Sequence, residues 1–294
     1  MRCLKYEFKS MVLQPEFLAA LIGACLLSLL SLTDIPEFHS LPEYSIAAPS
    51  PEQGSFLFRN VYGRLMYQYI CPILASIPVA CSYFREKECG MDALLIPACG
   101  RTRYICAKVL MTFLSGLFIA ILPFLLNMLY AEFAYPRNEL VRLDYLSFYT
   151  DRWQQLLDGS FFGRLMLTAP VLDHFLHVLL VGLWSAGAAL LTLGISFFFR
   201  KHYIINLLLG ALILLFAVLL LNAAEIYQFN PQEYFPLVTR IALLHGEPDQ
   251  RAIIYAGYHI FDFSPGALAA AYSALYGACA ALIATHLIKH RDII

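Results

Sequence analysis

The sequence predicts an all-α polytopic membrane protein with six transmembrane helices and both termini in the cytoplasm. Hydrophobic residues make up 60% of the 294 and charged residues only 14%, whereas soluble proteins carry about 25% charged residues. Six apolar stretches approach or reach the length of a bilayer span, and Lys and Arg are concentrated between alternate stretches. This composition excludes soluble enzyme folds. The net charge of −1 gives no reason to expect a nucleic-acid partner.

The six spans follow from helix geometry. A span needs about 20 apolar residues, because a helix rises about 1.5 Å per residue across a core about 30 Å thick. The predicted spans are residues 17–32, 66–84, 105–131, 171–199, 204–221 and 266–288. The fifth contains 14 Leu, Ile, Val or Phe, which favours insertion by roughly 4–8 kcal/mol. The first is the shortest and follows Pro15, which is expected to start its helix.

Residues 1–14 are predicted to form an amphipathic interfacial helix. An apolar face lies beside three cations; the residues are Leu4, Phe8, Met11 and Val12, with Arg2, Lys5 and Lys9. Such a helix suits the surface of an anionic leaflet, and a solvated tail is the alternative. A cleaved signal peptide is not predicted, because the charged lead-in is long and no A-x-A site follows Leu32.

The distribution of cations predicts the orientation. Twelve Lys and Arg lie in the 50 residues of segments 1–14, 84–108, 199–203 and 289–294. Only eight lie in the 114 residues of regions 33–66, 132–169 and 223–264. Because cytoplasmic loops retain Lys and Arg, the first set is expected inside and the second outside. The whole chain, residues 1–294, is thus expected to form a single transmembrane domain.

The predicted spans carry few charged residues. Glu16, Lys108, Asp173 and His286 lie near span ends, where side chains are expected to reach headgroups or water. Motifs of zinc proteases, elbow-type hydrolases and P-loop ATPases do not occur. We therefore expect a non-catalytic chain without a metal or cofactor of its own. The eight cysteines all fall in spans or cytoplasmic segments, so each is expected to be a reduced thiol.

One polar cluster lies at the outer start of the fourth span. It consists of Asp173, His174 and His177, of which Asp173 and His177 share a helical face at i,i+4 spacing. A metal or proton site is one interpretation of this cluster. A local hydrogen-bonded pair in water is the interpretation that the position at an interfacial helix end favours.

The sixth span carries a stripe of small residues. Ser273, Gly277 and Ala281 recur at four-residue spacing, which allows the backbone of another helix to approach closely. The partner helix is expected either in this chain or in a second subunit.

The segment between the second and third spans predicts a short cytoplasmic helix at residues 86–96. Residues 86–108 read EKECGMDALLIPACGRTRYICAK. The acidic side chains of Glu86 and Glu88 suit a helix start, and Pro97 is expected to end the helix. Its apolar face comprises Met91, Leu94 and Leu95. An apolar face held out by two spans indicates a protein partner, with attachment to headgroups as the alternative.

This segment resembles the cytoplasmic loop of ABC-2-type export permeases. The resemblance rests on the acidic pair, Gly90, the two leucines, Pro97 and the later Arg, aromatic and Lys, after the second of six spans. It implies the permease subunit of an ATP-driven exporter in a plasma membrane of the bacterial type. Glu86, Glu88, Met91, Leu94 and Leu95 would form the coupling surface. The implied partners are two ATP-binding subunits, which carry the ATP and Mg, a second permease subunit, identical or different, and membrane lipids.

Two other functional classes are also compatible with the sequence. An ion-coupled secondary carrier requires coupling residues inside the spans, of which the sequence offers few. A membrane-embedded metal-dependent enzyme requires a catalytic constellation, for which the cluster of Asp173, His174 and His177 is the candidate. Aromatic residues among charges in the outer regions suit the headgroup zone. Peptides, lipids and hydrophobic drugs are all compatible substrates.

The orientation predicts which thiols are accessible from outside. On intact cells, a membrane-impermeant thiol reagent should not label Cys89, whereas a cysteine introduced as Asp249→Cys in the last outer region should react. Mass spectrometry of the labelled chain measures both. Labelling of Cys89 from outside, with the introduced thiol silent, would show that the orientation is inverted.

Overall fold

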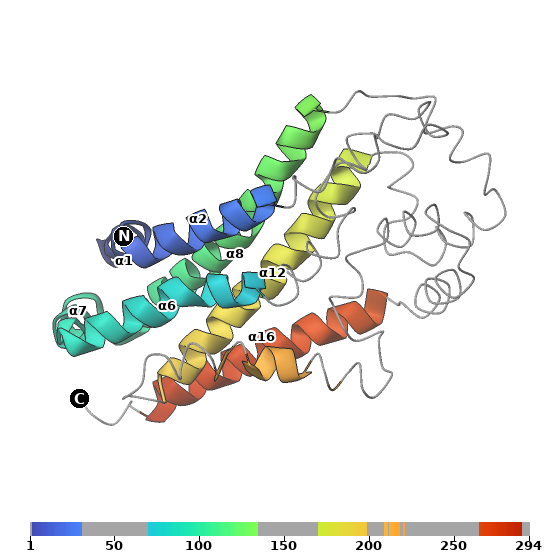
Figure 1. The fold of residues 1–294 in the computed structure, drawn as a ribbon. Coiled ribbons are helices and arrows are strands. Elements are labelled where there is room, and N and C mark those ends of the chain that lie inside the picture. The colour runs from blue at the N-terminus through green and yellow to red at the C-terminus, as the bar shows by residue number, and fades with distance from the viewer. Residues whose placement is uncertain are drawn as a thin grey trace, which may run out of the picture.

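The structure of the protein, a computed structural model, is helical in every regular element that it describes (Figure 1). It describes residues 2–30, 70–134, 170–198, 209–210, 212–217, 220 and 265–289. The helices are α1 (Arg2–Val12), α2 (Pro15–Leu30), α6 (Cys71–Glu88), α7 (Met91–Cys99), α8 (Arg101–Ala134), α12 (Pro170–Ser196) and α16 (Pro265–Lys289). Over this part of the chain, the prediction of an all-α fold is confirmed.

Several helices are long and apolar enough to cross a membrane. Three meet the requirement alone, over Arg101–Tyr130 in α8, Val178–Ser196 in α12 and Ala269–Leu287 in α16. Helices α1 and α2 meet it only together, with a bend of 55° between them, since they have only 11 and 16 residues. The described residues thus provide three candidate spans, or four if the bent pair is one span, as expected for a multi-pass membrane protein.

These candidates correspond to part of the predicted set of six. The third, fourth and sixth predicted spans match α8, α12 and α16, although α8 begins four residues earlier than predicted, at Arg101. Helix α6 covers most of the second, but its last turn consists of four charged residues, 85–88. Of the fifth, only residues 209–210, 212–217 and 220 are described, all helical. The predicted outer regions lie outside the described residues, apart from residues 132–134.

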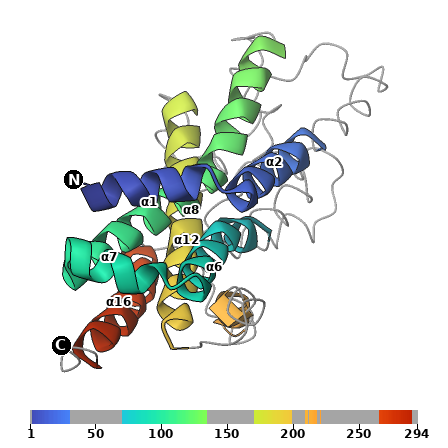
Figure 2. The same ribbon diagram turned by 90° about the vertical axis from the view of Figure 1, so that its left-hand side faces the viewer.

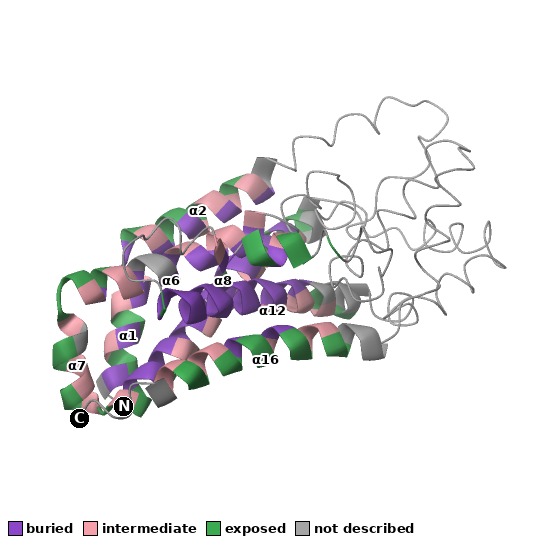
Figure 3. Cartoon of the chain, turned by 90° about the horizontal axis from the view of Figure 1, so that it is seen from below, coloured by how far each residue is buried: buried purple, intermediate pink, exposed green. Residues whose placement is uncertain are grey.

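Helix α12 is the centre of the bundle (Figure 3). In its candidate span 83% of residues are buried, compared with 44% in α8 and 11% in α16. Helices α6, α8 and α16 all pack against it. The reason lies in its sequence, where Gly, Ala and Ser make up more than half of residues 182–196, so that neighbouring backbones approach closely.

Two glycines show how close this approach is. A Cβ atom at Gly116 of α8 would lie 3.0 Å from the Cα atom of Ala186 on α12, which is backbone and cannot rotate away. On the other side of α12, a Cβ atom at Gly187 would meet the side chain of Leu275 on α16, which would have to shift. The contact between α8 and α12 therefore depends on the absence of a side chain at Gly116.

The connection from α6 to α8 differs from the predicted helix at residues 86–96. Glu86 and Glu88 belong to the last turn of α6, and Gly90, with a φ of +66°, separates it from α7. Pro97 was predicted to end the helix but lies inside α7, where it removes one backbone bond. The helix continues to Cys99 and ends at Gly100, whose φ of +80° no helix accommodates. Two left-handed glycines thus form the corner that presents α7 (Figure 2).

The close contact between α8 and α12 predicts the effect of a larger side chain. Gly116→Val should lower the free energy of unfolding by about 1–3 kcal/mol, because the added atoms force two backbones apart. Thermal unfolding in detergent measures this. Gly23→Val on α2 is the matched control, since a Cβ there meets nothing within 4 Å. Equal unfolding temperatures for the two variants would contradict the packing of α8 on α12.

Candidate functional site

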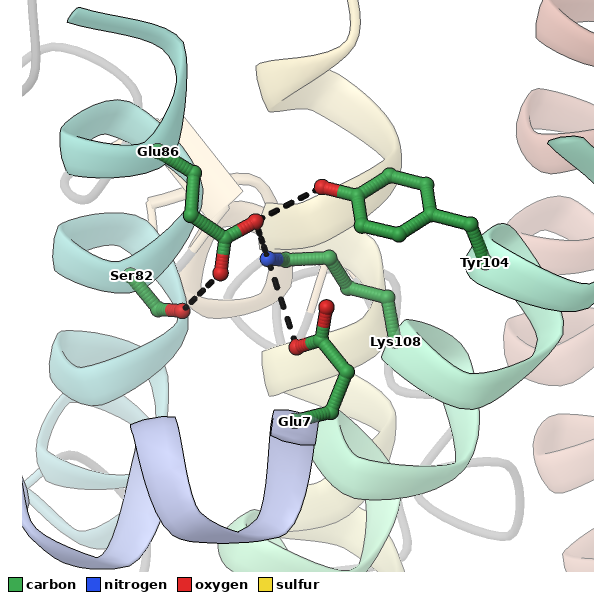
Figure 4. Close-up of polar contacts among 5 residues, drawn as sticks. All are labelled: Glu7, Ser82, Glu86, Tyr104 and Lys108. Atoms are coloured by element: carbon green, nitrogen blue, oxygen red, sulfur yellow. Dashed lines mark hydrogen bonds and ion pairs between the residues drawn. The ribbon is translucent and has the colours of Figure 1, made fainter. Parts of the chain in front are cut away.

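A buried ionic network joins α1, α6 and α8 beside the corner that presents α7 (Figure 4). Lys108 of α8 forms an ion pair with Glu86 of α6 and a second one with Glu7 of α1, the latter with 3.5 Å between Nζ and Oε2. Their side chains are 1%, 7% and 0% exposed, respectively. Three charges from three helices therefore meet out of contact with water.

Helical spacing explains how the partners converge. Tyr104 and Lys108 are four residues apart on α8, and Ser82 and Glu86 are four apart on α6, so each pair shares one face. The hydroxyl of Tyr104 donates to Oε2 of Glu86 at 2.6 Å, and the hydroxyl of Ser82 donates to Oε1 at 3.4 Å. Glu86 thus receives donors on both oxygens, as a buried carboxylate requires.

Helix α1 contributes Glu7 from its inward face. Cys3, Glu7 and Met11 lie one turn apart and are all buried, whereas Leu4 and Phe8 on the neighbouring face are 40% and 55% exposed. The predicted amphipathic character is therefore present, but the buried side of the helix is the one that carries a carboxylate.

The two carboxylates have unequal surroundings. Glu7 has a single long contact with Lys108, and its Oε1 is buried without a hydrogen-bond partner. Burial raises the pKa of the Glu7 carboxyl to about 7, which Lys108 only partly offsets. Two carboxylates facing one ammonium would leave an excess negative charge in a dry site. The arrangement therefore favours one proton shared within the network.

Aromatic rings connect the network to the rest of the bundle. The Lys108 ammonium lies 5.5 Å from the ring centroid of Tyr104 and 5.9 Å from that of Tyr83, within the range of cation–π attraction. The Tyr83 ring meets Phe197, just after α12, edge to face at 5.1 Å, and Phe197 stacks on His286 of α16 at 4.4 Å. The charges are thus linked by contact to the end of α12 and to α16.

The expectation for Lys108 is wrong. As a residue near a span end it was expected to reach headgroups or water, but it is 1% exposed and points into the bundle. Glu7 was not recognised as a site residue at all. The sequence signal was a lone lysine in the apolar run ICAKVL, but its partners lie 22 and 101 residues away along the chain. Glu16, by contrast, lies at a partly exposed position and pairs with Arg85.

The predicted coupling residues are distributed over different environments. Glu86 is buried in the network, while Glu88 is exposed. Leu94 is 68% exposed, and Met91 is half-buried. Leu95 turns inward with Ile96 against a cluster of buried residues that includes Cys3 and Tyr104.

The other predicted residues stay apart from the network. Ser273, Gly277 and Ala281 lie exposed on α16, whose opposite side packs on α12 through Leu275 and Cys279. Asp173, His174 and His177 lie in the first turns of α12, and their side chains are outside the described residues. Among the side chains that are described, no group of three metal-binding residues occurs, and seven cysteines are free thiols.

Comparisons with known proteins assign no family to this chain. No family model matches it, and neither a curated protein nor a solved structure was found that does.

The network predicts a large effect from loss of its cation. Lys108→Met should lower the free energy of unfolding by about 3–5 kcal/mol, because it leaves the buried carboxyl groups of Glu86 and Glu7 without their cation. Adding Glu86→Gln should restore part of the loss, since it removes one stranded charge. Thermal unfolding in detergent measures all three proteins. Arg103→Met, at an exposed site on the same helix, is the control, and an equal effect from it would show that the network does not stabilise the fold.

Proposed function

We propose that this chain is the permease subunit of an ATP-driven exporter of the ABC-2 type. The proposal rests on one observation above all, the short helix α7 that two left-handed glycines hold at the corner between α6 and α8. The resemblance of residues 86–108 to an export-permease loop gives this helix its role. It is the surface on which a separate ATP-binding subunit docks.

The two sides of α7 suit this role. Its inner side, with Leu95, Ile96 and Cys99, packs against buried residues of α1 and α8. Its outer side exposes Leu94, Pro97 and Ala98. A helix that is anchored on one side and apolar on the other resembles a docking element more than a solvated loop. In this proposal Leu94 and Glu88 contact the partner, Met91 lies at the edge, and Glu86 and Leu95 support the helix from behind.

The buried network attaches the corner that carries α7 to the rest of the bundle. It lies where α6 ends and α8 begins, so both ends of the α7 corner are fixed to the same charges. A docking helix transmits motion only if it is attached rigidly to the spans, and an ion pair between the two flanking helices provides this attachment. Removal of the pair would let the corner move independently of the bundle.

In the proposed topology, the chain has six spans and both termini in the cytoplasm. Helix α1, α7 and the C-terminal end of α16 lie at one end of the bundle, where Leu287 packs with residues of α1 and α7 (Figures 1 and 2). That end is assigned to the cytoplasm, and α1 lies on its membrane surface with Leu4 and Phe8 toward the lipid. The chain is then a multi-pass protein of a bacterial plasma membrane.

The partners of the proposed exporter lie in other chains. Two ATP-binding subunits hold the ATP and Mg, and a second permease, identical or different, completes the path. The small-residue face of α16, which carries Ser273, Gly277 and Ala281, is exposed among the described helices and suits contact with that second permease. Peptides, lipids and hydrophobic drugs remain the substrate classes.

One observation favours a second candidate function. Buried acidic and basic groups at the end of a span are also what a proton-coupled carrier uses, and Glu7, Lys108 and Glu86 supply them. Transport by this protein in vesicles distinguishes the two functions. An exporter requires the ATP-binding subunits and ATP, whereas a carrier requires only a proton gradient.

The docking role of α7 predicts the effect of a single charge on its outer side. Leu94→Asp should abolish co-purification of the ATP-binding subunit or substrate-stimulated ATP hydrolysis, because a buried apolar contact contributes about 1.5–3 kcal/mol. Pull-down and ATPase turnover in nanodiscs measure these effects. Leu95 is unsuitable for this test, since its side chain supports the fold.

The matched control for this experiment is Thr102→Asp, which adds the same charge at an exposed position on the first turn of α8. Membrane insertion should be normal in both variants. Retention of the subunit and unchanged turnover in Leu94→Asp would rule out docking through α7.

A further inference from the structure

The buried network contains one more carboxylate than it has cations. Glu7, Glu86 and Lys108 are all at least nine-tenths buried, and Lys108 is the cation that contacts both carboxylates. If both carboxylates were ionised, the site would hold a net negative charge away from water. Such a charge is costly, and a buried acid relieves the cost by keeping its proton.

The hydrogen bonds indicate which acid keeps it. Glu86 accepts from Tyr104 and Ser82 and forms the shorter contact with Lys108, so its ionised form is well supported. Glu7 has only the contact of 3.5 Å to Lys108, and its other oxygen has no partner. A carboxylate with one bare buried oxygen is the more expensive ion, so neutral Glu7 is favoured.

Glu7 is also one of the contacts that hold α1 to the bundle, so a change in its ionisation can release the helix. Helix α1 is short, carries a net positive charge and exposes Leu4 and Phe8 on its outer side. It is held to the bundle by its inward face, with Glu7 between Cys3 and Met11. The state of this one carboxyl therefore bears directly on whether α1 stays docked.

We propose that Glu7 carries a proton when α1 is docked, so that α1 is held against α6 and α8 more tightly at low pH than at high pH. Docking of α1 beside the corner between α6 and α8 therefore depends on the protonation of Glu7. This inference does not depend on the proposed transport function, because it concerns only the attachment of α1.

The groups around Glu7 agree with this direction. From α8 and α6, and from α1 itself, it faces the following charged or titratable side chains: Lys108, Tyr104, Glu86, Cys3 and Tyr6. Lys108 is the cation among them, and Glu86 already holds it. Burial and the charge of Glu86 both raise the pKa of Glu7, whereas Lys108 lowers it.

The sign of the pH dependence follows from this shift. The pKa of the Glu7 carboxyl rises from 4.5, its ordinary value, to about 7 in the docked state. The docked state therefore binds more protons than the released state between these two values. The equilibrium constant for docking of α1 is therefore highest below about pH 4.5. It falls by up to about tenfold per pH unit above that value and levels off above about pH 7.

The reactivity of Cys3 measures this equilibrium in the full-length protein in nanodiscs. Cys3 is buried on the inward face of α1, one turn before Glu7, so iodoacetamide reaches it only when α1 is released. Its protection is the alkylation rate of the unfolded chain at the same pH divided by the rate in the native protein. Cys71, buried on α6, reports openings of the rest of the bundle.

In the wild-type protein, protection of Cys3 should fall by about two orders of magnitude between about pH 4.5 and about pH 7. In Glu7→Gln, which mimics the neutral acid, it should be independent of pH. Glu88→Gln, at an exposed site on α6, should behave like the wild type. A pH-independent wild type, or a slope that persists in Glu7→Gln, would overturn the proposal.

Infrared spectroscopy of the same samples identifies the protonated group. Above about pH 5.5, where ordinary carboxyls are ionised, the pH-difference spectrum of the wild type should show a neutral-carboxyl C=O band that disappears as the pH rises through about 7. This band should be absent in Glu7→Gln. If the band persists in Glu7→Gln and is lost in Glu86→Gln, the proton lies on Glu86 and the assignment is wrong. The wild-type titration alone tests the proposal if a variant does not fold.

Discussion

The need to pair the buried ammonium of Lys108 governs the end of the bundle where α1, α6 and α8 meet. An amine on an apolar helix is tolerated away from water only if carboxylates reach it, and here they come from two other helices, through Glu86 and Glu7. Because Lys108 is two turns into α8, its partners must lie beside the start of that helix. The pairing therefore fixes where α6 ends and where α1 lies. It also fixes the corner between α6 and α8 that carries α7.

The rest of the bundle depends on a different kind of contact. Around α12, glycine and alanine bring backbones together. The two regions meet at Tyr83, whose ring lies near the Lys108 ammonium and against Phe197. A displacement of α7 would thus reach α12 through side chains in contact. For the proposed permease, this is the physical route from a docked ATP-binding subunit to the membrane helices.

The sequence anticipated most of the helices and part of the site. Long apolar runs are sufficient to predict α8, α12 and α16, because in a membrane the backbone must satisfy its own hydrogen bonds. Pro97 was expected to end a helix but lies inside α7, which ends instead at Gly100. The face assigned to Met91, Leu94 and Leu95 is divided between solvent and core, because helical periodicity does not indicate which of two apolar sides meets the bundle.

What the sequence determined by itself is the class of the molecule. Its lack of charge and its apolar runs predict a helical membrane protein, and several described helices are long and apolar enough to cross a membrane. Only the tertiary structure decided that Lys108 is buried rather than at the surface, and that Glu7 and Glu86 are its partners. The physical reason is distance along the chain. Composition and periodicity act over a few helical turns, whereas the partner of a buried charge is chosen by helices that meet after as many as 101 residues.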